Sequence, residues 1–194
     1  MANILLIDNV DSFTYNLVEQ LRINNNNVYI YRNTISIQTI IHKIQNILYP
    51  ILMFSPGPGD PKNAGCMPKL LKYCKGKIPI IGICLGHQAI VEEYGGKISI
   101  SKNIVHGKKS LIYHDQKYMF ENIKNPFYVG RYHSLITTDI PKSLIVNAWY
   151  KKKIVMSVMN EADKVCGFQF HPESILTTEG DKLLNATIKW AENY

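Results

Sequence analysis

The stretch I-P-I-I-G-I-C-L-G-H-Q-A-I-V-E-E-Y-G-G, residues 78–96, decides how the rest of the chain is interpreted. It begins with a short apolar run rich in β-branched residues, which predicts a buried strand. Residues 87–94 are typical of a helix, and this helix should end at two glycines. Cys84 therefore lies on a tight strand-to-helix turn between Gly82 and Gly86. This is the arrangement of a nucleophile elbow that carries sulfur in place of oxygen.

Two features of this turn favour a reactive thiol. The glycines let the backbone turn sharply and leave room for a substrate beside the sulfur. The helix that follows directs its free N–H groups and partial positive charge at Cys84, which favours the thiolate that attacks carbonyl groups. Two other interpretations stay open at this point, since free cysteines are often buried in cores, and similar turns bind phosphate or simply pack.

Length and composition indicate an ordinary globular protein. The chain has 194 residues, of which 46% are hydrophobic and 19% charged, and we expect a single domain over residues 1–194. The net charge of +7 could indicate a nucleic acid or an anionic surface as partner. The lysines are scattered, however, and the densest run, residues 151–153, is expected on a turn. Nucleic-acid binding is therefore not predicted.

The cysteines and the N-terminus favour a cytoplasmic protein. None of the four cysteines belongs to a C-x-x-C pair, so a zinc site or a thioredoxin-type site is not expected. A chain of this length needs no disulfide framework, and reduced thiols fit the cytoplasm. The N-terminus lacks the basic segment and cleavage site of a signal peptide. No apolar run approaches the roughly 20 residues that cross a bilayer, so no membrane association is predicted.

The pattern of apolar residues predicts an α/β fold. Strands are expected at residues 3–8, 28–31, 51–55 and 80–83, and helices at 12–23, 35–47, 64–74 and 87–94. This alternation predicts an open, mostly parallel central sheet with helices on both faces. Further strands are expected at 97–100, 110–113, 144–149, 154–159 and 167–170, before a last helix at 180–192. The later strands suggest a smaller antiparallel, strand-rich part folded back over one edge of the parallel sheet.

Two loops after predicted strands contain candidate site residues. In Ser55-Pro56-Gly57-Pro58-Gly59 the prolines lack an N–H group, which leaves the two glycines as donors in the Pro-Gly-Pro-Gly core. A stiff loop with isolated N–H donors suits an oxyanion, and an ordinary turn is the alternative. After the first strand, Asp8 and Asp11 could hold a metal ion, but we expect Asp11 or Ser12 to cap the next helix.

A cysteine nucleophile needs a histidine to take and return a proton, and that histidine needs an orienting partner. Among six histidines, His171 follows a strand end at the edge where open α/β folds place active sites. Pro172 restricts its backbone, and Glu173 lies two positions further on. His87 begins the elbow helix, but we expect its side chain to point outward. A lone histidine is more often structural than catalytic, so its position makes His171 only a candidate base.

Three separated motifs, taken together and in this order, resemble those of the class I (triad-type) glutamine amidotransferases. They are Ser55-Pro56-Gly57-Pro58-Gly59, Gly82-Ile83-Cys84-Leu85-Gly86-His87-Gln88 and Phe170-His171-Pro172-Glu173. The resemblance covers essentially the whole chain. Residues 8–16, 106–108, 131–135 and 171–176 are most similar to the glutaminase component of anthranilate synthase, and next to that of aminodeoxychorismate synthase.

The resemblance implies a role for each motif. Cys84 would be the nucleophile, His171 the base and acid, and Glu173 the residue that orients His171. The residues implied to bind glutamine or its oxyanion are Gly57, Pro58, Gly59, Leu85, Gln88, Ser134 and Leu135. No metal ion or organic cofactor is implied for this chain.

The same resemblance implies a partner protein. The family delivers ammonia to a synthase subunit that aminates chorismate, and no chorismate-binding segment is evident in this chain. We therefore expect a heterodimer or heterotetramer with such a subunit, in tryptophan biosynthesis or, as the alternative, folate biosynthesis. The strand-rich part and His106-Gly107-Lys108 are candidate contact surfaces. The two other interpretations are a self-standing cysteine hydrolase and a non-catalytic partner subunit.

Overall fold

The computed structural model describes residues 1–101 and 107–193, and its largest element is a nine-stranded sheet. The order across this sheet is β2-β1-β3-β4-β11-β10-β9-β6-β7, and β5 and β8 form a separate pair. The strands are β1 Asn3–Asp8, β2 Asn27–Arg32, β3 Pro50–Phe54, β4 Ile80–Ile83, β5 Lys97–Ile100, β6 Lys108–His114, β7 Phe127–Arg131, β8 Leu135–Asp139, β9 Ile145–Tyr150, β10 Ile154–Asn160 and β11 Val165–Phe168. The helices are α1 Thr14–Ile23, α2 Ile37–Gln45, α3 Met67–Cys74, α4 Leu85–Glu93 and α5 Gly180–Glu192, with short 3-10 turns η1 Pro61–Asn63 and η2 Tyr118–Phe120.

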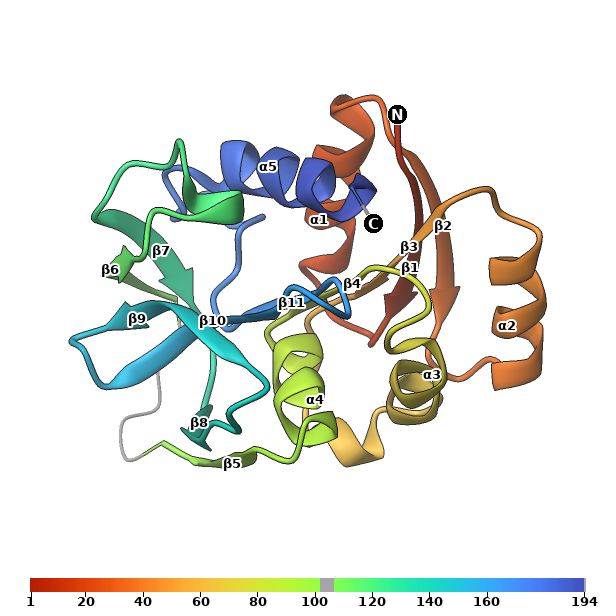
Figure 1. Cartoon of the computed structure of the whole chain (residues 1–194), viewed down its shortest axis with the longest axis horizontal. Helices are drawn as coiled ribbons and strands as arrows, with labels where there is room; N and C mark the ends of the chain where they lie inside the picture. The colour runs from red at the N-terminus through yellow and green to blue at the C-terminus, as the bar shows by residue number, and fades with distance from the viewer. Residues whose placement is uncertain (102–106, 194) are drawn as a thin grey trace.

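Helices cover both faces of the sheet, as the alternation of strands and helices predicts. Figure 1 shows α1 and α5 on one side of the sheet and α3 and α4 on the other. Successive residues of β1 therefore point to opposite faces: Ile4 and Leu6 pack with α1 and α5, whereas Leu5 and Ile7 pack with α2, α3 and α4. All four side chains are fully buried, which explains why the sequences of the central strands are continuously apolar.

The five strands β2, β1, β3, β4 and β11 are parallel to one another. Because they are parallel, their carboxyl ends lie at one edge of the sheet, and the loops that follow them meet there. Asp8, Ser55 and Cys84 each come within one residue of the end of a parallel strand, and His171 follows β11 by three residues. The topology therefore gathers the predicted site at a single edge.

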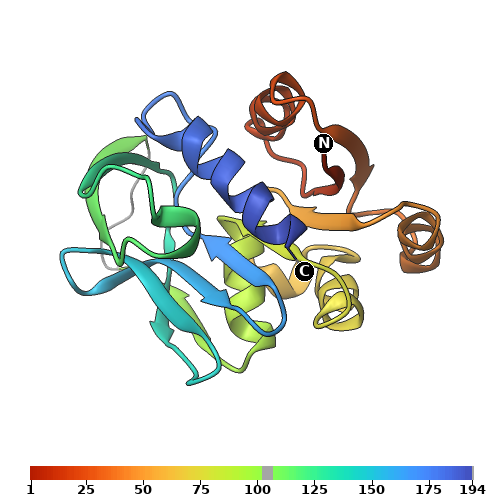
Figure 2. The same cartoon turned by 45° about the horizontal axis from the view of Figure 1, so that its top comes forward.

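The predicted α/β fold is confirmed, but the later strands are arranged differently from the prediction, and the strand expected at 167–170 is β11, Val165–Phe168. Strands β10, β9, β6 and β7 are antiparallel and continue the main sheet beyond β11 instead of folding back over its edge. In Figure 2 this antiparallel half lies to the left, and α5 crosses in front of the sheet. The separate pair β5 and β8 packs against α4 on the other side.

The described residues include no helix long and apolar enough to cross a membrane.

Candidate active site

Cys84 joins β4 to α4 in a backbone conformation that few side chains adopt. Its φ of 52° and ψ of −97° lie in a strained region for a residue other than glycine. The conformation is held by the N–H group of Cys84, which donates to the Phe168 carbonyl at 2.7 Å, and by the Cys84 carbonyl, which accepts from Gln88 at 3.0 Å. The sharp turn predicted here is therefore made by the cysteine itself, and the strain is concentrated at the sulfur-bearing residue.

The two flanking glycines act through close packing. A Cβ atom on Gly82 would lie 2.5 Å from the Gly86 backbone, and a Cβ atom on Gly86 would lie 2.8 Å from the Phe54 carbonyl oxygen. Both distances are far below van der Waals contact, so any side chain at either position would push the start of α4 away from β3 and β4. The glycines thus set how deeply the N-terminus of α4, and Cys84 with it, sits against the sheet.

The histidine–carboxylate pair lies beside this turn. His171 Nδ1 is 2.6 Å from Glu173 Oε1, and the two residues are only 2% and 3% exposed. The His171 backbone is fixed as well, because its N–H donates to Gly130 on β7 at 3.1 Å and its carbonyl accepts from the Thr177 hydroxyl at 2.6 Å. The imidazole is therefore positioned by its own backbone and by a buried carboxylate.

The surroundings of His171 favour the charged ring. Burial alone lowers the pKa of His171, but the Glu173 carboxylate and the Cys84 sulfur raise it well above its usual value of 6.5. The second ring nitrogen, Nε2, is buried and makes no hydrogen bond of regular geometry to a described residue. Since the sulfur of Cys84 is close enough to act on this ring, Nε2 is the nitrogen available to exchange a proton with it.

Two aromatic rings enclose the imidazole. The Phe13 ring lies 5.2 Å from the His171 ring and the Tyr132 ring lies 4.9 Å from it, both in edge-on orientations, and the two aromatic rings also contact each other. Tyr132 is fixed in turn by a 3.0 Å hydrogen bond between its hydroxyl and that of Ser174. These contacts restrict rotation of the imidazole and shield it from water.

A pocket of about 180 Å³ opens directly over the cysteine. It is lined by Gly57, Pro58, Gly59, Cys84, Gln88, Tyr132, His133, Ser134 and Leu135. Six of the seven residues predicted to bind glutamine or its oxyanion are in this lining. The seventh, Leu85, is the residue after Cys84, and its side chain would lie 2.7 Å from a Cβ atom placed on Gly57. The predicted oxyanion loop and the start of α4 are thus in direct contact.

The loop between β1 and α1 fixes the proline–glycine loop from behind. The Asn9 backbone N–H donates to the Ser55 hydroxyl at 2.8 Å, and the Asn9 side chain donates to the Ser55 carbonyl at 2.9 Å. The Asp8 carboxylate accepts hydrogen bonds from the Val10 N–H and the Thr14 hydroxyl, and so stabilises the turn between β1 and α1. No group of three or more potential metal ligands occurs among residues 1–101 and 107–193.

Capping of α1 differs from the prediction. Phe13 occupies the N-cap position of α1 and its side chain forms no capping hydrogen bond. Asp11 still contributes, because its carboxylate accepts the Phe13 N–H at 2.8 Å in the turn that precedes the helix. Neither Asp11 nor Ser12 is therefore the N-cap residue, although Asp11 stabilises the turn.

Arg131, the last residue of β7, is buried and positions the segment that follows it. Arg131 is 3% exposed, and its Nε donates to His133 Nε2 at 3.0 Å, while His133 Nδ1 lies 2.8 Å from the Leu135 carbonyl. Burial and the Arg131 charge lower the pKa of His133 to about 3. His133 is therefore neutral, accepts from Arg131, and donates to Leu135 at the rim of the pocket.

The side chains of His87 and of the three other cysteines are all buried. His87 was expected to point outward, and this is wrong: it is fully buried against Gly167 of β11, and burial lowers its pKa to about 4. Cys66, Cys74 and Cys166 are free, and burial raises the pKa of each thiol, to about 12 for Cys74. The other cysteines are therefore poor nucleophiles.

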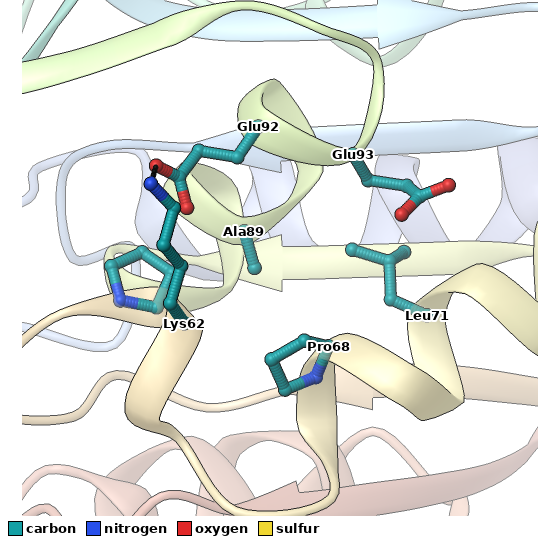
Figure 3. A pocket seen from close by; sticks show the side chains of 7 residues that line it. Lys62, Pro68, Leu71, Ala89, Glu92 and Glu93 are labelled. Atoms are coloured by element: carbon teal, nitrogen blue, oxygen red, sulfur yellow. Dashed lines mark ion pairs between the residues drawn. The ribbon is translucent and has the colours of Figure 1, made fainter.

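Another hollow, of about 190 Å³, lies at the opposite end of α4 from Cys84. Figure 3 shows Lys62 reaching across it to Glu92, with the Lys62 Nζ and Glu92 Oε1 atoms 3.3 Å apart. Pro68, Leu71 and Ala89 also line it. Its lining contains neither a cysteine nor a histidine, so it offers none of the chemistry found at Cys84.

Three residues at the site are not in the predicted set. Tyr132 and His133 line the pocket, and they belong to the stretch Arg131-Tyr132-His133-Ser134-Leu135 that carries part of the resemblance. Gln169 is fully buried, with its Nε2 3.8 Å from the Cys84 sulfur. Its sequence signal is a single polar residue between Phe168 and Phe170, which alternation places on the opposite face from the two rings. His106 lies outside the described residues.

Comparison with known proteins identifies the family. The model of the family "Glutamine amidotransferase class-I" matches residues 5–190. Proteins named "Anthranilate synthase component 2" are similar over nearly the whole chain. Those of Buchnera aphidicola subsp. Schizaphis graminum and subsp. Acyrthosiphon pisum are 63% and 60% identical over 191 residues, 98% of this chain and 97% and 95% of theirs. That of Haemophilus influenzae is 48% identical over 193 residues, with both chains fully covered.

Solved structures agree on the fold. A candidate GMP synthase protein from Thermoplasma acidophilum has a TM-score of 0.86 at 22% identity, covering 100% of this chain and 96% of its own. A glutamine amidotransferase from Thermotoga maritima has a TM-score of 0.75 at 16% identity, covering 100% of this chain and 99% of its own. At these identities the likeness concerns the arrangement of strands and helices alone.

Proposed function

The chain belongs to the class-I glutamine amidotransferase family, and from that membership we propose that it is the glutaminase subunit of an anthranilate synthase. In this role it hydrolyses L-glutamine and passes the ammonia to a chorismate-binding synthase subunit in tryptophan biosynthesis. We further propose that residues 1–194 act as one glutamine amidotransferase domain, and that the protein works in the cytoplasm, where reducing conditions keep its cysteines free.

The proposal assigns the covalent step to Cys84. The thiolate attacks the side-chain amide carbon of glutamine, and the carbonyl oxygen becomes an oxyanion that accepts hydrogen bonds from the N–H groups of Leu85 and Gly57. When this intermediate collapses, His171 gives its Nε2 proton to the departing nitrogen, which leaves as ammonia. A glutamyl thioester on Cys84 remains. The contact between Gly57 and Leu85 supports a shared oxyanion site.

The second half of the cycle uses the same groups in reverse. His171, now neutral, takes a proton from a water molecule that attacks the thioester carbonyl. Glutamate is released, and the sulfur leaves as thiolate beside the charged imidazole. Glu173 offsets the charge of the ring at both stages, which is supported by the 2.6 Å contact with His171 and by burial of the pair.

Glutamine is proposed to bind in the pocket over Cys84. Its amide end would face the sulfur and the proline–glycine loop, and its amino-acid end would meet Gln88, Ser134 and Leu135. A pocket of about 180 Å³ suits a small polar amino acid better than a peptide chain. This favours glutamine over the peptide substrates of a self-standing cysteine hydrolase.

The ammonia acceptor is proposed to be a second protein docked near His171. The segments that carry Phe13 and Glu173 also carry strongly exposed apolar side chains: Val10 is 52% exposed, Tyr15 68% and Ile175 98%. Exposed apolar groups beside a catalytic centre are typical of a partner interface. The expected contact residues Gly107 and Lys108 lie close by, because Lys108 begins β6 opposite Arg131 and a Cβ atom on Gly107 would be 3.5 Å from the Tyr132 ring.

The observation that carries the proposal is that Cys84, His171 and Glu173 come together beside one small pocket. The test uses the complex with the synthase subunit that co-purifies with this chain. Cys84→Ala should abolish anthranilate formation from glutamine while leaving formation from added ammonia intact. Formation of aminodeoxychorismate would move the assignment to folate biosynthesis, and undiminished use of glutamine by the variant would reject the mechanism.

A further inference from the structure

The buried side chain of Gln169 connects the substrate pocket to the Cys84 sulfur, and neither half of the proposed catalytic cycle uses it. Gln169 is fully buried, and its backbone N–H donates to the Met156 carbonyl of β10 at 2.9 Å. Its Nε2 lies 3.8 Å from the Cys84 sulfur, and its Oε1 accepts a hydrogen bond from Gln88 Nε2 at 3.3 Å. Two amides therefore form a chain that ends at the predicted nucleophile.

The order of donors and acceptors in this chain decides what it does to the sulfur. With Gln88 Nε2 donating to Gln169 Oε1, the N–H group of Gln169 faces the sulfur and favours a negative charge there. If both amides were turned over, an oxygen would face the sulfur, accept the thiol proton and oppose ionisation. In Gln169→Glu both terminal atoms are oxygens. This substitution therefore replaces the atom that faces the sulfur only if the N–H group faces it in the wild type, and so distinguishes the two orientations.

We propose that Gln169 is a further catalytic residue, which stabilises the thiolate of Cys84 through its side-chain N–H group and is held in that orientation by Gln88. The proposal rests on the proposed function in one respect, that Cys84 is the nucleophile. The thiolate then has His171 and Gln169 as polar neighbours, and Cys84 is only 7% exposed. The same N–H group assists the sulfur when it leaves during hydrolysis of the thioester.

The arrangement also explains the geometry of Gln88. This side chain lines the pocket, but its Nε2 is committed to Gln169, so its Oε1 is the atom left to accept a hydrogen bond from the ammonium group of glutamine. An acceptor suits a cation, and the amide dipole is fixed with its positive end toward Gln169. Substrate recognition and thiolate stabilisation therefore require the same orientation of the two amides.

The direct test measures how fast iodoacetamide alkylates Cys84 across a range of pH, with the Cys84 peptide followed by mass spectrometry. Gln169→Met keeps the length of the side chain but removes the donor, and should slow alkylation at pH 7 by about 10-fold, since a hydrogen bond to a charged acceptor is worth at least that factor. Gln169→Glu keeps the shape and the bond from Gln88, and should slow alkylation further. In both variants the alkylation profile should move to higher pH.

Asn147 offers a matched control. It is a fully buried amide on β9 whose Nδ2 contacts the Met119 sulfur at 3.4 Å, with no contact to Cys84. Asn147→Leu should keep the wild-type alkylation profile at Cys84. An unchanged profile in Gln169→Met, or faster alkylation in Gln169→Glu, would overturn the proposal. If the Gln169 variants fold poorly, labelled wild-type protein gives the answer, because alkylation of Cys84 should shift the side-chain amide proton signal of Gln169, and an unmoved signal would reject the contact.

Steady-state kinetics of the complex with the synthase subunit separate this role from substrate binding. Gln169→Glu keeps the acceptor for Gln88 Nε2, so it should lower kcat for glutamine and leave KM unchanged, whereas Gln88→Met should also raise KM. Failure of this inference is distinct from failure of the proposed function. If Cys84→Ala still hydrolyses glutamine, the nucleophile is wrong; if it does not, and Gln169→Met behaves as wild type, only the role of Gln169 is wrong.

Discussion

His171 and Glu173 form a 2.6 Å contact between imidazole and carboxylate, two residues apart in sequence and almost hidden from solvent. The two side chains can meet at this short separation because the chain turns after His171, where the Ser174 N–H donates to the His171 carbonyl at 3.2 Å. A buried carboxylate in this position selects the ring tautomer with hydrogen on Nδ1 and leaves Nε2 for proton exchange. The pair therefore sets both the direction and the protonation of the base.

Replacing this carboxylate should damage catalysis far more than it damages folding. Glu173→Gln keeps the shape but removes the charge that offsets the imidazolium, so kcat for glutamine should fall on the order of 10³-fold. The measurement is glutamine hydrolysis by the complex with the synthase subunit, with anthranilate formation from ammonia as the control. A loss smaller than about 10-fold would show that the charge of Glu173 is not needed.

The buried arginine should act on substrate binding. Arg131→Lys keeps the charge but cannot reproduce the 3.0 Å bond from Nε to His133, so the 2.8 Å contact between His133 and Leu135 loses its support. We expect KM for glutamine to rise by about 10-fold with a smaller effect on kcat, in line with the loss of one charged hydrogen bond. Equal KM values in Arg131→Lys and wild type would contradict this positioning role.

Gly82, two residues before Cys84, should not tolerate a side chain. In Gly82→Ala the new Cβ atom meets the Gly86 backbone at 2.5 Å, so α4 and Cys84 must move, and we expect about 1–3 kcal/mol of lost stability together with lost glutaminase activity. Gly95→Ala is the control: its φ of +90° makes the change strained, but no atom lies within 4 Å of the new group. That variant should lose stability and keep kcat, as measured by urea unfolding and by hydrolysis.

Acid should destabilise the protein through His87. Its pKa is about 4 in the folded chain and 6.5 when exposed, so the unfolded chain binds the extra proton between these values. The stability that depends on neutral His87 is therefore complete above pH 6.5 and is lost as the pH falls toward 4. Within this window the free energy of unfolding should fall more steeply in wild type than in His87→Gln, by on the order of 1 kcal/mol per pH unit.

The measurement for His87 is denaturant unfolding at several pH values between about 4 and 7. His42→Gln changes a histidine that is exposed on α2, and it should keep the wild-type slope. Parallel curves for wild type and His87→Gln would mean that the buried ring does not control acid stability.

The sequence predicted most of the parallel half because each signal there is local. The helix at Gly180–Glu192 has the predicted bounds, and the strand at Asn3–Asp8 does too. Strands β7 and β8 were not predicted, because Phe127–Arg131 and Leu135–Asp139 are short and flank the site residues at 132–134, where no regular alternation continues. Their pairing depends on distant partners, β6 and β5, which local patterns do not encode.

The residues of the site were predictable from the sequence, but the contacts between them were not. Motif spacing and family resemblance selected Cys84, His171 and Glu173, and the topology brings their strand ends to one edge. The link from Gln88 through Gln169 to the sulfur depends on how β11 and α4 pack, and no sequence rule specifies that packing. The burial of His87 has the same origin, because Gly167 leaves room for its ring beneath α4.

The most direct test of the whole account is to capture the covalent intermediate. The complex with the synthase subunit would be mixed with glutamine, quenched in acid within milliseconds, digested and analysed by mass spectrometry. The account predicts a single glutamyl group on the peptide that contains Cys84, absent in Cys84→Ala. Steady consumption of glutamine with no acyl group on Cys84, or with the acyl group on another residue, would contradict it.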